Sequence, residues 1–260
     1  MVLCIILCIC GGCAVNPITG QSELMLISEQ QDIAIGRKYA PEVERQMGGR
    51  IPDEGLQNYV DGVGQRIACV SHRPELEYHF VALEDDSVNA FALPGGYIFI
   101  TKGMLRKLST EAQLAAILAH EMTHIVARDS SAVMSRQIGV SVLLSAVTSE
   151  KTPESVSMVV DLTHQILGLR YSRDDEREAD LAGLGYMVAA GYNPYGMVES
   201  MQMLENQEQI RPIEFFSTHS SPENRVAYLQ EKIEGGYYNL AGLRVGEDDY
   251  HRYVLMRLND

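Results

Sequence analysis

The residues best suited to chemistry are two histidines and a glutamate in the stretch "LAAILAHEMTHIVARDS". His120 and His124 are four positions apart, so on a helix both imidazoles lie on one face and can reach one metal ion. Glu121 stands between them, offset toward the place of a metal-bound water. Zinc with three protein ligands lowers the pKa of such a water to about 7, and a nearby carboxylate can take its proton. The spacing therefore predicts metal-assisted hydrolysis.

The alternative is that these three side chains lie on the solvated face of a surface helix. The neighbouring residues argue against it, because they are apolar on several sides of the helix: Leu114, Ile117, Leu118, Met122 and Ile125. Such a helix is expected to be largely buried. Burying two histidines beside a glutamate costs free energy unless a partner, such as a metal ion, interacts with them. The composition of the helix therefore favours the metal site.

A third protein ligand has to come from elsewhere in the chain. A further histidine at the metzincin spacing is absent, since Ala127 and Ser130 stand where Gly and His would be. A carboxylate from a later helix is the alternative, and "RYSRDDEREADLAGLG" offers two candidates, Glu176 and Glu178.

Helical spacing favours the first of these two carboxylates. Glu176, Asp180 and Gly183 fall on one face of a helix, whereas Glu178 points roughly to the other side. A ligating histidine also needs an acceptor for its second ring N–H, and Asp180 can supply it from the same face as Glu176. Gly183 and Ala179 would let the two helices approach closely. A merely charged surface helix would explain neither of these small residues.

The surrounding segments predict an α+β fold in which helices dominate and a small sheet precedes the histidine-bearing helix. Alternating apolar residues predict three strands, in "ELEYHFVALE", "SVNAFALPGG" and "YIFIT". Capping boxes begin one helix at Ser28, with Gln31, and another at Thr110, with Gln113. Further helices are predicted for "PDEGLQNYVDGVGQRIACV" and for residues 131–148, 153–170, 173–190, 194–206 and 222–234, with "NQEQIRPIEFFSTHSSPENR" as a loop.

Overall charge excludes one class of partner. The formal net charge of the 260 residues is −14, whereas nucleic-acid binding needs clustered Lys and Arg to contact phosphates. We therefore expect no nucleic-acid partner.

The N-terminal segment "MVLCIILCICGGC" is apolar and then rich in small residues. Its apolar run is far shorter than the roughly 20 residues that span a bilayer, and it has the form of a secretory signal. The ending resembles a bacterial lipobox, although Cys10 stands where Leu is usual and no Lys or Arg precedes the run. The resemblance implies lipidation at Cys13, with residues 1–13 as a signal segment and 14–260 as one domain. Ala14 after that cysteine resembles outer-membrane sorting.

Together, "HEMTH" and "SRDDEREAD" resemble the M48 family of zinc metallopeptidases, of the gluzincin group, and within it the exported bacterial lipoprotein branch of the BepA, LoiP and Oma1 type. The likeness extends to "NPITGQSELMLISEQQDIAIG", to "VNAFALPGGYIFITKGML" and to "STHSSPENR", which departs from the family's STHP loop by delaying the proline to Pro222. The resemblance implies a zincin-like fold.

The same resemblance implies roles for individual residues. It makes His120, His124 and Glu176 the ligands of one zinc ion per chain, Glu121 the general base, and Asp180 the acid of the family's ExxxD motif.

Two further elements match the family. Asn89, Ala90 and Phe91 match an edge strand that lines the cleft, where extended peptide can add as another strand; an ordinary buried strand is the alternative. His219 matches a loop histidine for which two roles stay open, stabilising the oxyanion or capping the metal at rest. A solvated loop histidine is the plain alternative.

The expectation from these observations is a zinc metalloendopeptidase of the cell envelope, anchored by lipid and facing the periplasm from the outer membrane. Its implied substrates are misfolded or unassembled envelope proteins. The competing hypothesis is a latent, zinc-stabilised chaperone or assembly factor that binds such proteins without routine cleavage.

Overall fold

The computed structural model describes residues 12–148, 168–219, 224–236 and 238–258. In chain order the elements are β1 (Cys13–Val15), β2 (Ser22–Leu24), α1 (Glu29–Gln46), α2 (Glu54–Ala68), β3 (His79–Leu83), β4 (Ala90–Leu93), β5 (Tyr97–Thr101), α3 (Lys102–Leu105), α4 (Glu111–Ala127), α5 (Asp129–Thr148), α7 (Arg173–Ala189), α8 (Tyr195–Ile210), α9 (Phe215–Thr218), α10 (Arg225–Glu234), α11 (Glu247–Tyr250) and the π-helix η3 (His251–Leu255). The α+β class predicted from the sequence is confirmed.

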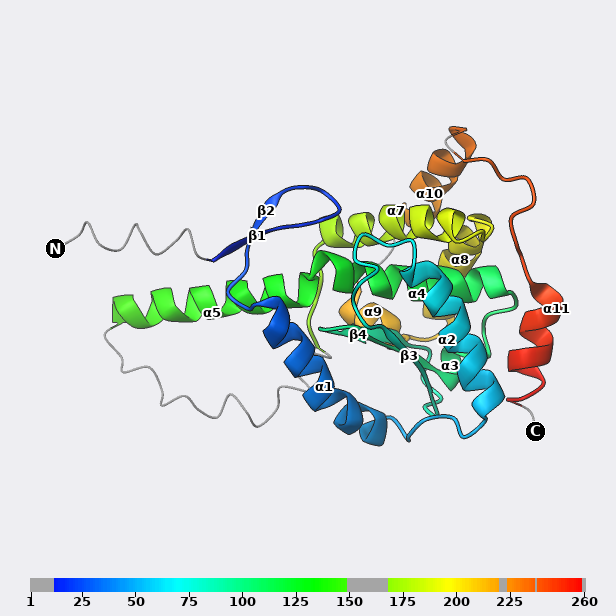
Figure 1. Cartoon of the computed structure of the whole chain (residues 1–260), viewed down its shortest axis with the longest axis horizontal. Coiled ribbons are helices and arrows are strands. Elements are labelled where there is room, and N and C mark those ends of the chain that lie inside the picture. Colours follow the sequence, from blue (N-terminus) through cyan, green and yellow to red (C-terminus); the bar gives the residue numbers. More distant parts are fainter. Residues whose placement is uncertain (1–11, 149–167, 220–223, 237, 259–260) are drawn as a thin grey trace.

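The three predicted strands form one small sheet in the order β3-β5-β4. The central strand β5 pairs in parallel with β3 and antiparallel with β4, with Phe91 opposite Phe99. Helix α1 packs on one face of this sheet, and α2 and α4 cover the other (Figure 1). Strand β4 is therefore an edge strand that lies beside the histidine-bearing helix.

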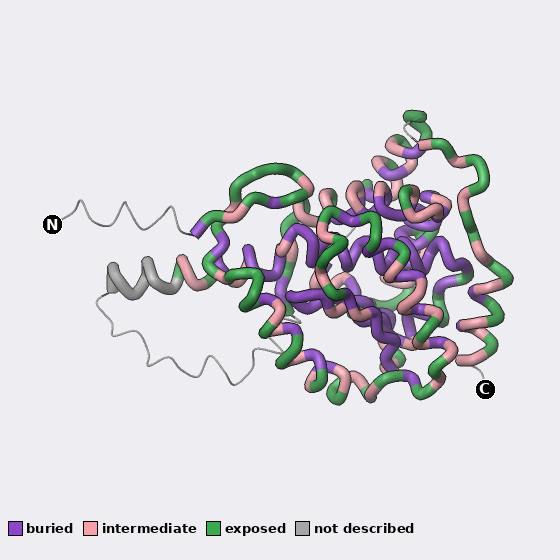
Figure 2. Tube along the Cα trace, in the orientation of Figure 1, coloured by how far each residue is buried: buried purple, intermediate pink, exposed green. Residues whose placement is uncertain are grey.

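Helix α4 runs through the middle of the molecule (Figure 2), and all of its residues are buried. Thr110 is its N-cap as predicted, and Gln113 N–H donates to the threonine hydroxyl at 3.1 Å. The reciprocal bond of a capping box does not form at Thr110, because the Gln113 side chain accepts from Ser109 N–H at 2.7 Å instead. Small residues let two later helices pack closely on it. A Cβ at Gly183 of α7 would lie 3.3 Å from the backbone of Ala119, and one at Gly196 of α8 only 2.5 Å from that of Ala112.

Several boundaries differ from the predictions. Helix α8 continues to Ile210, beyond the predicted end at 206, and the short helix α9 forms inside the segment expected to be a loop. The antiparallel hairpin of β1 and β2 was not predicted. The predicted helix at 153–170 lies largely outside the described residues, and its end at 168–170 is not helical.

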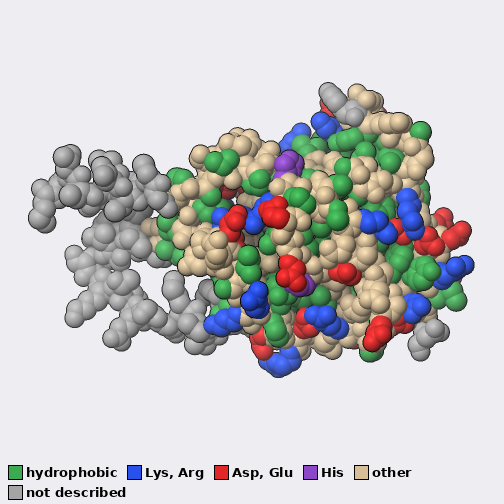
Figure 3. Space-filling model, in the orientation of Figure 1, with side chains coloured by type: hydrophobic (Ala, Val, Ile, Leu, Met, Phe, Trp, Pro, Cys, Tyr) green, Lys and Arg blue, Asp and Glu red, His purple; other side chains and the backbone are tan. Residues whose placement is uncertain are grey.

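Two further features of the molecule are the charges on its surface and the hydropathy of its helices. Acidic and basic side chains are interspersed over the face drawn in Figure 3. Among the described residues, none of the helices combines the length and the apolar character needed to cross a membrane.

Candidate metal centre

Four buried side chains converge at the middle of the molecule. His120 and His124 come from α4, Glu176 from α7, and His219 from the residue that ends α9. One ligand atom from each lies within 4.8 Å of the others. The structure brings Glu176 to the two histidines, on the side that the helix-face argument predicted, and it places the predicted loop histidine His219 in the same cluster.

The distances inside this cluster suit a tetrahedral metal ion. His120 Nε2 lies 3.3 Å from His124 Nε2 and 3.3 Å from His219 Nδ1. Zinc with bonds of about 2.0–2.1 Å to nitrogen places tetrahedral ligands roughly 3.3–3.4 Å apart. Imidazole and carboxylate are also ligand types that zinc takes, so both the spacing and the donor set fit zinc.

Glu176 holds a charge at the centre of the cluster. Its Oε1 lies 2.8 Å from His219 Nδ1 and 3.7 Å from His124 Nε2, and its Oε2 lies 3.6 Å from His120 Nε2. Burial alone would raise the pKa of this carboxyl group, but the surrounding histidines, His219 first, lower it to about 2. The ligand is therefore ionised, as metal binding requires.

Each α4 histidine is oriented by a buried carboxylate on its far side. His120 Nδ1 lies 3.0 Å from Asp180 Oδ1, and His124 Nδ1 lies 2.7 Å from Asp129 Oδ2. A ring that donates its Nδ1 proton to a carboxylate leaves Nε2 free to bind a metal. The structure thus puts Asp180 where an outer acceptor was expected and supplies a second acceptor, Asp129, that sequence analysis missed.

Sequence analysis also missed Arg225, which is buried behind the cluster at the start of α10. Its guanidinium donates to Asp180 Oδ2 at 2.7 Å and to Glu176 Oε2 at 3.1 Å. Tyr228 of the same helix donates its hydroxyl proton to Asp180. Burial would raise the pKa of Asp180, but the positive charge of Arg225 holds it well below its usual range. Arg225 ends the quoted stretch "STHSSPENR", but its role could not be seen there, because its partners lie 45 or more positions earlier.

Glu121 differs from these satisfied carboxylates. It is 1% exposed, and its Oε1 accepts no hydrogen bond within the described parts of the chain. The Nε2 atom of His219 lies 3.4 Å from that oxygen. Burial raises the pKa of Glu121. A buried carboxylate oxygen without a donor, one residue from a metal ligand, is placed to accept a proton from a bound water.

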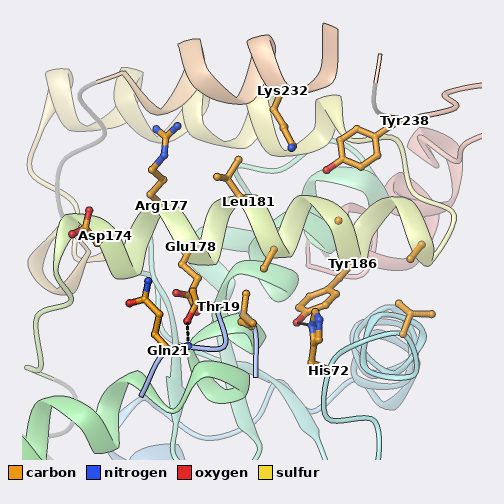
Figure 4. Close-up of a pocket in the computed structure, with 15 residues that line it drawn as sticks. Thr19, Gln21, His72, Asp174, Arg177, Glu178, Leu181, Tyr186, Lys232 and Tyr238 are labelled. Carbon is orange, nitrogen blue, oxygen red and sulfur yellow. Dashed lines mark hydrogen bonds between the residues drawn. The ribbon is translucent and has the colours of Figure 1, made fainter. Parts of the chain in front are cut away.

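The competing carboxylate, Glu178, points away from the cluster. It accepts a hydrogen bond from the Asn16 amide at 2.8 Å and lines a separate cavity of about 790 Å³ on the outer side of α7 (Figure 4). Tyr186 and His72 lie in the same cavity, with the His72 ring bonded to the tyrosine hydroxyl. This cavity is therefore distinct from the metal centre.

The remaining predicted residues lie at the sheet edge and at the N-terminal hairpin. Asn89 directly precedes β4, and Ala90 and Phe91 begin it. Ala90 packs in the core that includes α4, whereas Phe91 faces the cluster that includes α1. Cys13 is exposed at the start of β1.

Comparison with known proteins agrees with this geometry. Residues 54–233 match Peptidase family M48. The chain is 28% identical over 227 residues to the beta-barrel assembly-enhancing protease of Escherichia coli K12, covering 81% of this chain and 45% of that protein. It is 27% identical to the protein of the same name from Yersinia pestis, covering 81% of this chain and 46% of the relative. It is 35% identical over 182 residues to the mitochondrial metalloendopeptidase OMA1 of Schizosaccharomyces pombe, covering 66% of this chain and 52% of the relative.

The chain spans about half the length of these curated relatives. The family match, however, includes the HExxH helix, the helix that carries Glu176 and the segment around His219. M48 peptidases are zinc-dependent, and the cluster described above has the donors for that ion. On the match and the geometry together, this chain belongs to Peptidase family M48.

Proposed function

We propose that the protein is a zinc-dependent metalloendopeptidase in which His120, His124 and Glu176 bind one zinc ion. The observation that carries the proposal is the convergence of these three side chains, buried and at tetrahedral spacing, beside an unpartnered Glu121 oxygen. Zinc in such a setting supplies Lewis acidity, which polarises a carbonyl and acidifies water. Family membership and the metalloprotease relatives support the same activity.

The residues around the ion have distinct tasks in this proposal. Glu121 takes the proton of the attacking water and returns it to the leaving nitrogen. Asp180 and Asp129 hold the two histidines in the tautomer that offers Nε2. Arg225 neutralises Glu176 and Asp180, which keeps both carboxylates ionised inside the protein.

His219 gives the enzyme a resting state in this proposal. Its ring lies inside the ligand cluster and stacks on Phe215 with ring centroids 4.4 Å apart. A fourth protein ligand would close the position that a catalytic zinc keeps open for water or substrate. We therefore propose that His219 caps the metal at rest and moves away when substrate binds, and this observation favours a latent enzyme as the second candidate.

The proposed substrates are unfolded or unassembled proteins of the bacterial cell envelope. The names of the Escherichia coli and Yersinia pestis relatives, which refer to beta-barrel assembly, support the envelope setting. The position of β4 at the end of the sheet supports a sequence-tolerant mode of binding, because main-chain hydrogen bonds hold an added strand. Lipidation at Cys13, with outer-membrane attachment, belongs to the same proposal.

The test is fragment release from an unfolded model protein by the chain lacking residues 1–13. Glu121→Gln is the control, because it keeps the shape of the side chain and removes its basicity. The parent should cleave the protein, and the variant should cleave it about 10²–10⁴-fold more slowly. Both proteins should contain the same amount of zinc.

His219→Ala separates the two candidates. If the parent is slow and His219→Ala is faster, the enzyme is latent and His219 is its cap. Cleavage by Glu121→Gln at the parent's rate would contradict the proposed mechanism, and inactivity of the parent and of His219→Ala with zinc bound would favour a binding protein.

A further inference from the structure

We propose that a second cavity, beside the start of β4, is a specificity pocket for a lysine or arginine side chain of the bound polypeptide. This inference rests on the proposed peptidase function. The cavity has a volume of about 250 Å³ and is lined chiefly by Met47, Asp85, Ser87, Asn89, Phe91 and Glu214. Pockets for whole small-molecule ligands run from about 300 to 1,000 Å³, so this one suits a single side chain.

The charge of this cavity is uncompensated. Asp85 accepts from the Ser87 amide at 2.7 Å, and Glu214 accepts from the Ser217 hydroxyl at 3.0 Å. Within the residues described, neither carboxylate forms an ion pair. Their neighbour Asp86 shows the ordinary arrangement, because it pairs with Arg106 at 3.0 Å and with Lys102 at 3.6 Å. Two carboxylates at one cavity without a cation favour a cationic ligand.

Two buried oxygen atoms at the same cavity also lack a hydrogen-bond donor. Asn89 is only 8% exposed, yet its Oδ1 has no hydrogen-bond partner in the described structure, and neither has Ser87 Oγ. Buried polar atoms are normally satisfied, and those that are not call for an explanation. Lysine offers three N–H donors and arginine five, and neither has an acceptor. A cationic side chain is therefore the ligand that would satisfy both kinds of group.

The apolar lining suits the rest of such a side chain. Met47 is half-buried and Phe91 is 6% exposed, and both belong to the packing between the sheet and α1. Long cationic side chains lay their methylene stems along apolar surface and keep the charged end in a polar environment.

The position of the cavity fits a polypeptide added to the open edge of β4. Thr101 N–H donates to Asn89 O at 3.1 Å, so in the antiparallel pattern the backbone groups of Ala90 and Ala92 point to the open edge. Side chains of an added strand alternate between the two faces of the sheet. One set would point toward α4 and the metal centre, and the other toward α1 and this cavity. Thr218, which also lines the cavity, directly precedes His219.

The experiment uses quenched fluorescent peptides that differ only at one position, which carries lysine, arginine, citrulline or norleucine and is scanned across the cleaved bond. We expect the parent to favour lysine or arginine over its neutral partner by about 3–10-fold in kcat/KM, as for partly solvated charge pairs. The Asp85→Asn, Glu214→Gln double variant should bring that ratio to about 1. Asp86→Asn, one residue away and already paired, should leave the ratio unchanged.

Binding to zinc-loaded Glu121→Gln separates this inference from the proposed function. Tighter binding of the lysine or arginine peptide, lost in the double variant, would support the pocket even if no peptide were cleaved. Absence of cleavage by the parent would count against the peptidase activity alone. Equal binding and equal cleavage of charged and neutral peptides at every position scanned would overturn the inference and leave the peptidase intact.

Discussion

Helix α4 buries two carboxylates in opposite ways, one at its N-terminus and one beside the metal centre. Near its N-terminus, Glu111 is fully buried and accepts from the Tyr59 hydroxyl at 2.5 Å, from Arg66 at 2.8 Å and from Arg244 at 2.9 Å. Ten residues later, Glu121 is as deeply buried, but its Oε1 has no hydrogen bond in the described structure. The described structure surrounds Glu111 with its own cations, whereas Glu121, the proposed base, keeps one oxygen without a hydrogen-bond donor.

The same contrast extends to the groups around each carboxylate. At the N-terminus of α4 the first amides are also satisfied, since Glu111 N–H donates to Gly246 O at 3.2 Å and Ala112 N–H to Val245 O at 3.0 Å. At the metal centre, histidine nitrogens and a carboxylate converge at distances set for an ion. A buried polar cluster in which some atoms have no hydrogen-bond partner therefore indicates a functional site better than a buried polar cluster whose atoms are all paired.

Replacing each of the two glutamates by glutamine tests this comparison. Glu111→Gln leaves Arg66 and Arg244 without their shared anion, so we expect the free energy of unfolding to fall by about 2–3 kcal/mol, because both arginines are half exposed and can be solvated. Glu121→Gln changes a side chain whose Oε1 accepts no hydrogen bond in the described structure, so zinc-loaded protein should lose less than about 1 kcal/mol. Urea unfolding of both variants measures this, and the reverse order of effects would refute the contrast.

Asp129→Asn sharpens the comparison at the metal end. The asparagine keeps the shape but puts an amide in place of the carboxyl group that orients the His124 ring, so zinc affinity should fall about 10–100-fold. Competition against a chromogenic chelator measures the change. Asp174→Asn, an exposed acid in the first turn of α7, is the matched control. Unchanged zinc affinity in Asp129→Asn would show that the Asp129 carboxyl group does not support zinc binding by His124.

A modest effect is expected at a carboxylate near the surface. Asp53 caps α2 by accepting from Leu56 N–H at 2.8 Å, and this bond lowers its pKa. Asp53→Ala should cost about 1 kcal/mol at pH 7. A depressed pKa means that the electrostatic part of this contribution is present above the ordinary value of about 3.9 and is lost as pH falls through the lower folded value.

Stability of the parent and of Asp53→Ala should therefore converge toward pH 3. Asp53→Asn, which keeps a cap without titrating, should show a difference from Asp53→Ala that does not change with pH. A constant gap between parent and Asp53→Ala from pH 7 to pH 3 would contradict the assignment.

Local periodicity was enough to predict the metal cluster in outline. The spacing of four between His120 and His124, and the shared face of Glu176 and Asp180, are properties of helices that hold wherever the helices lie. The sheet followed from alternation in the same way. These parts of the molecule depend on residues that are close in sequence.

The residues that were missed depend on distant contacts. Asp129 reaches His124 because Arg128 takes a left-handed conformation, with φ of 63°, that a non-glycine residue rarely adopts. Arg128 is held there by Asp32 at 2.6 Å and by Ile27 O at 2.7 Å, about a hundred positions earlier. Arg225 likewise acquires its role only when α10 packs on α7. No local pattern encodes either contact.

The most direct test of the account compares two glutamates that lie two residues apart on α7. Glu176 faces the histidines and Glu178 faces the Asn16 amide, so the zinc dissociation constant should rise by more than about 100-fold in Glu176→Gln and stay at the parent's value in Glu178→Gln. Chelator competition on the parent, at about one zinc per chain, and on both variants decides it. Parent-like affinity in Glu176→Gln, or loss of zinc in Glu178→Gln, would contradict the metal centre described here.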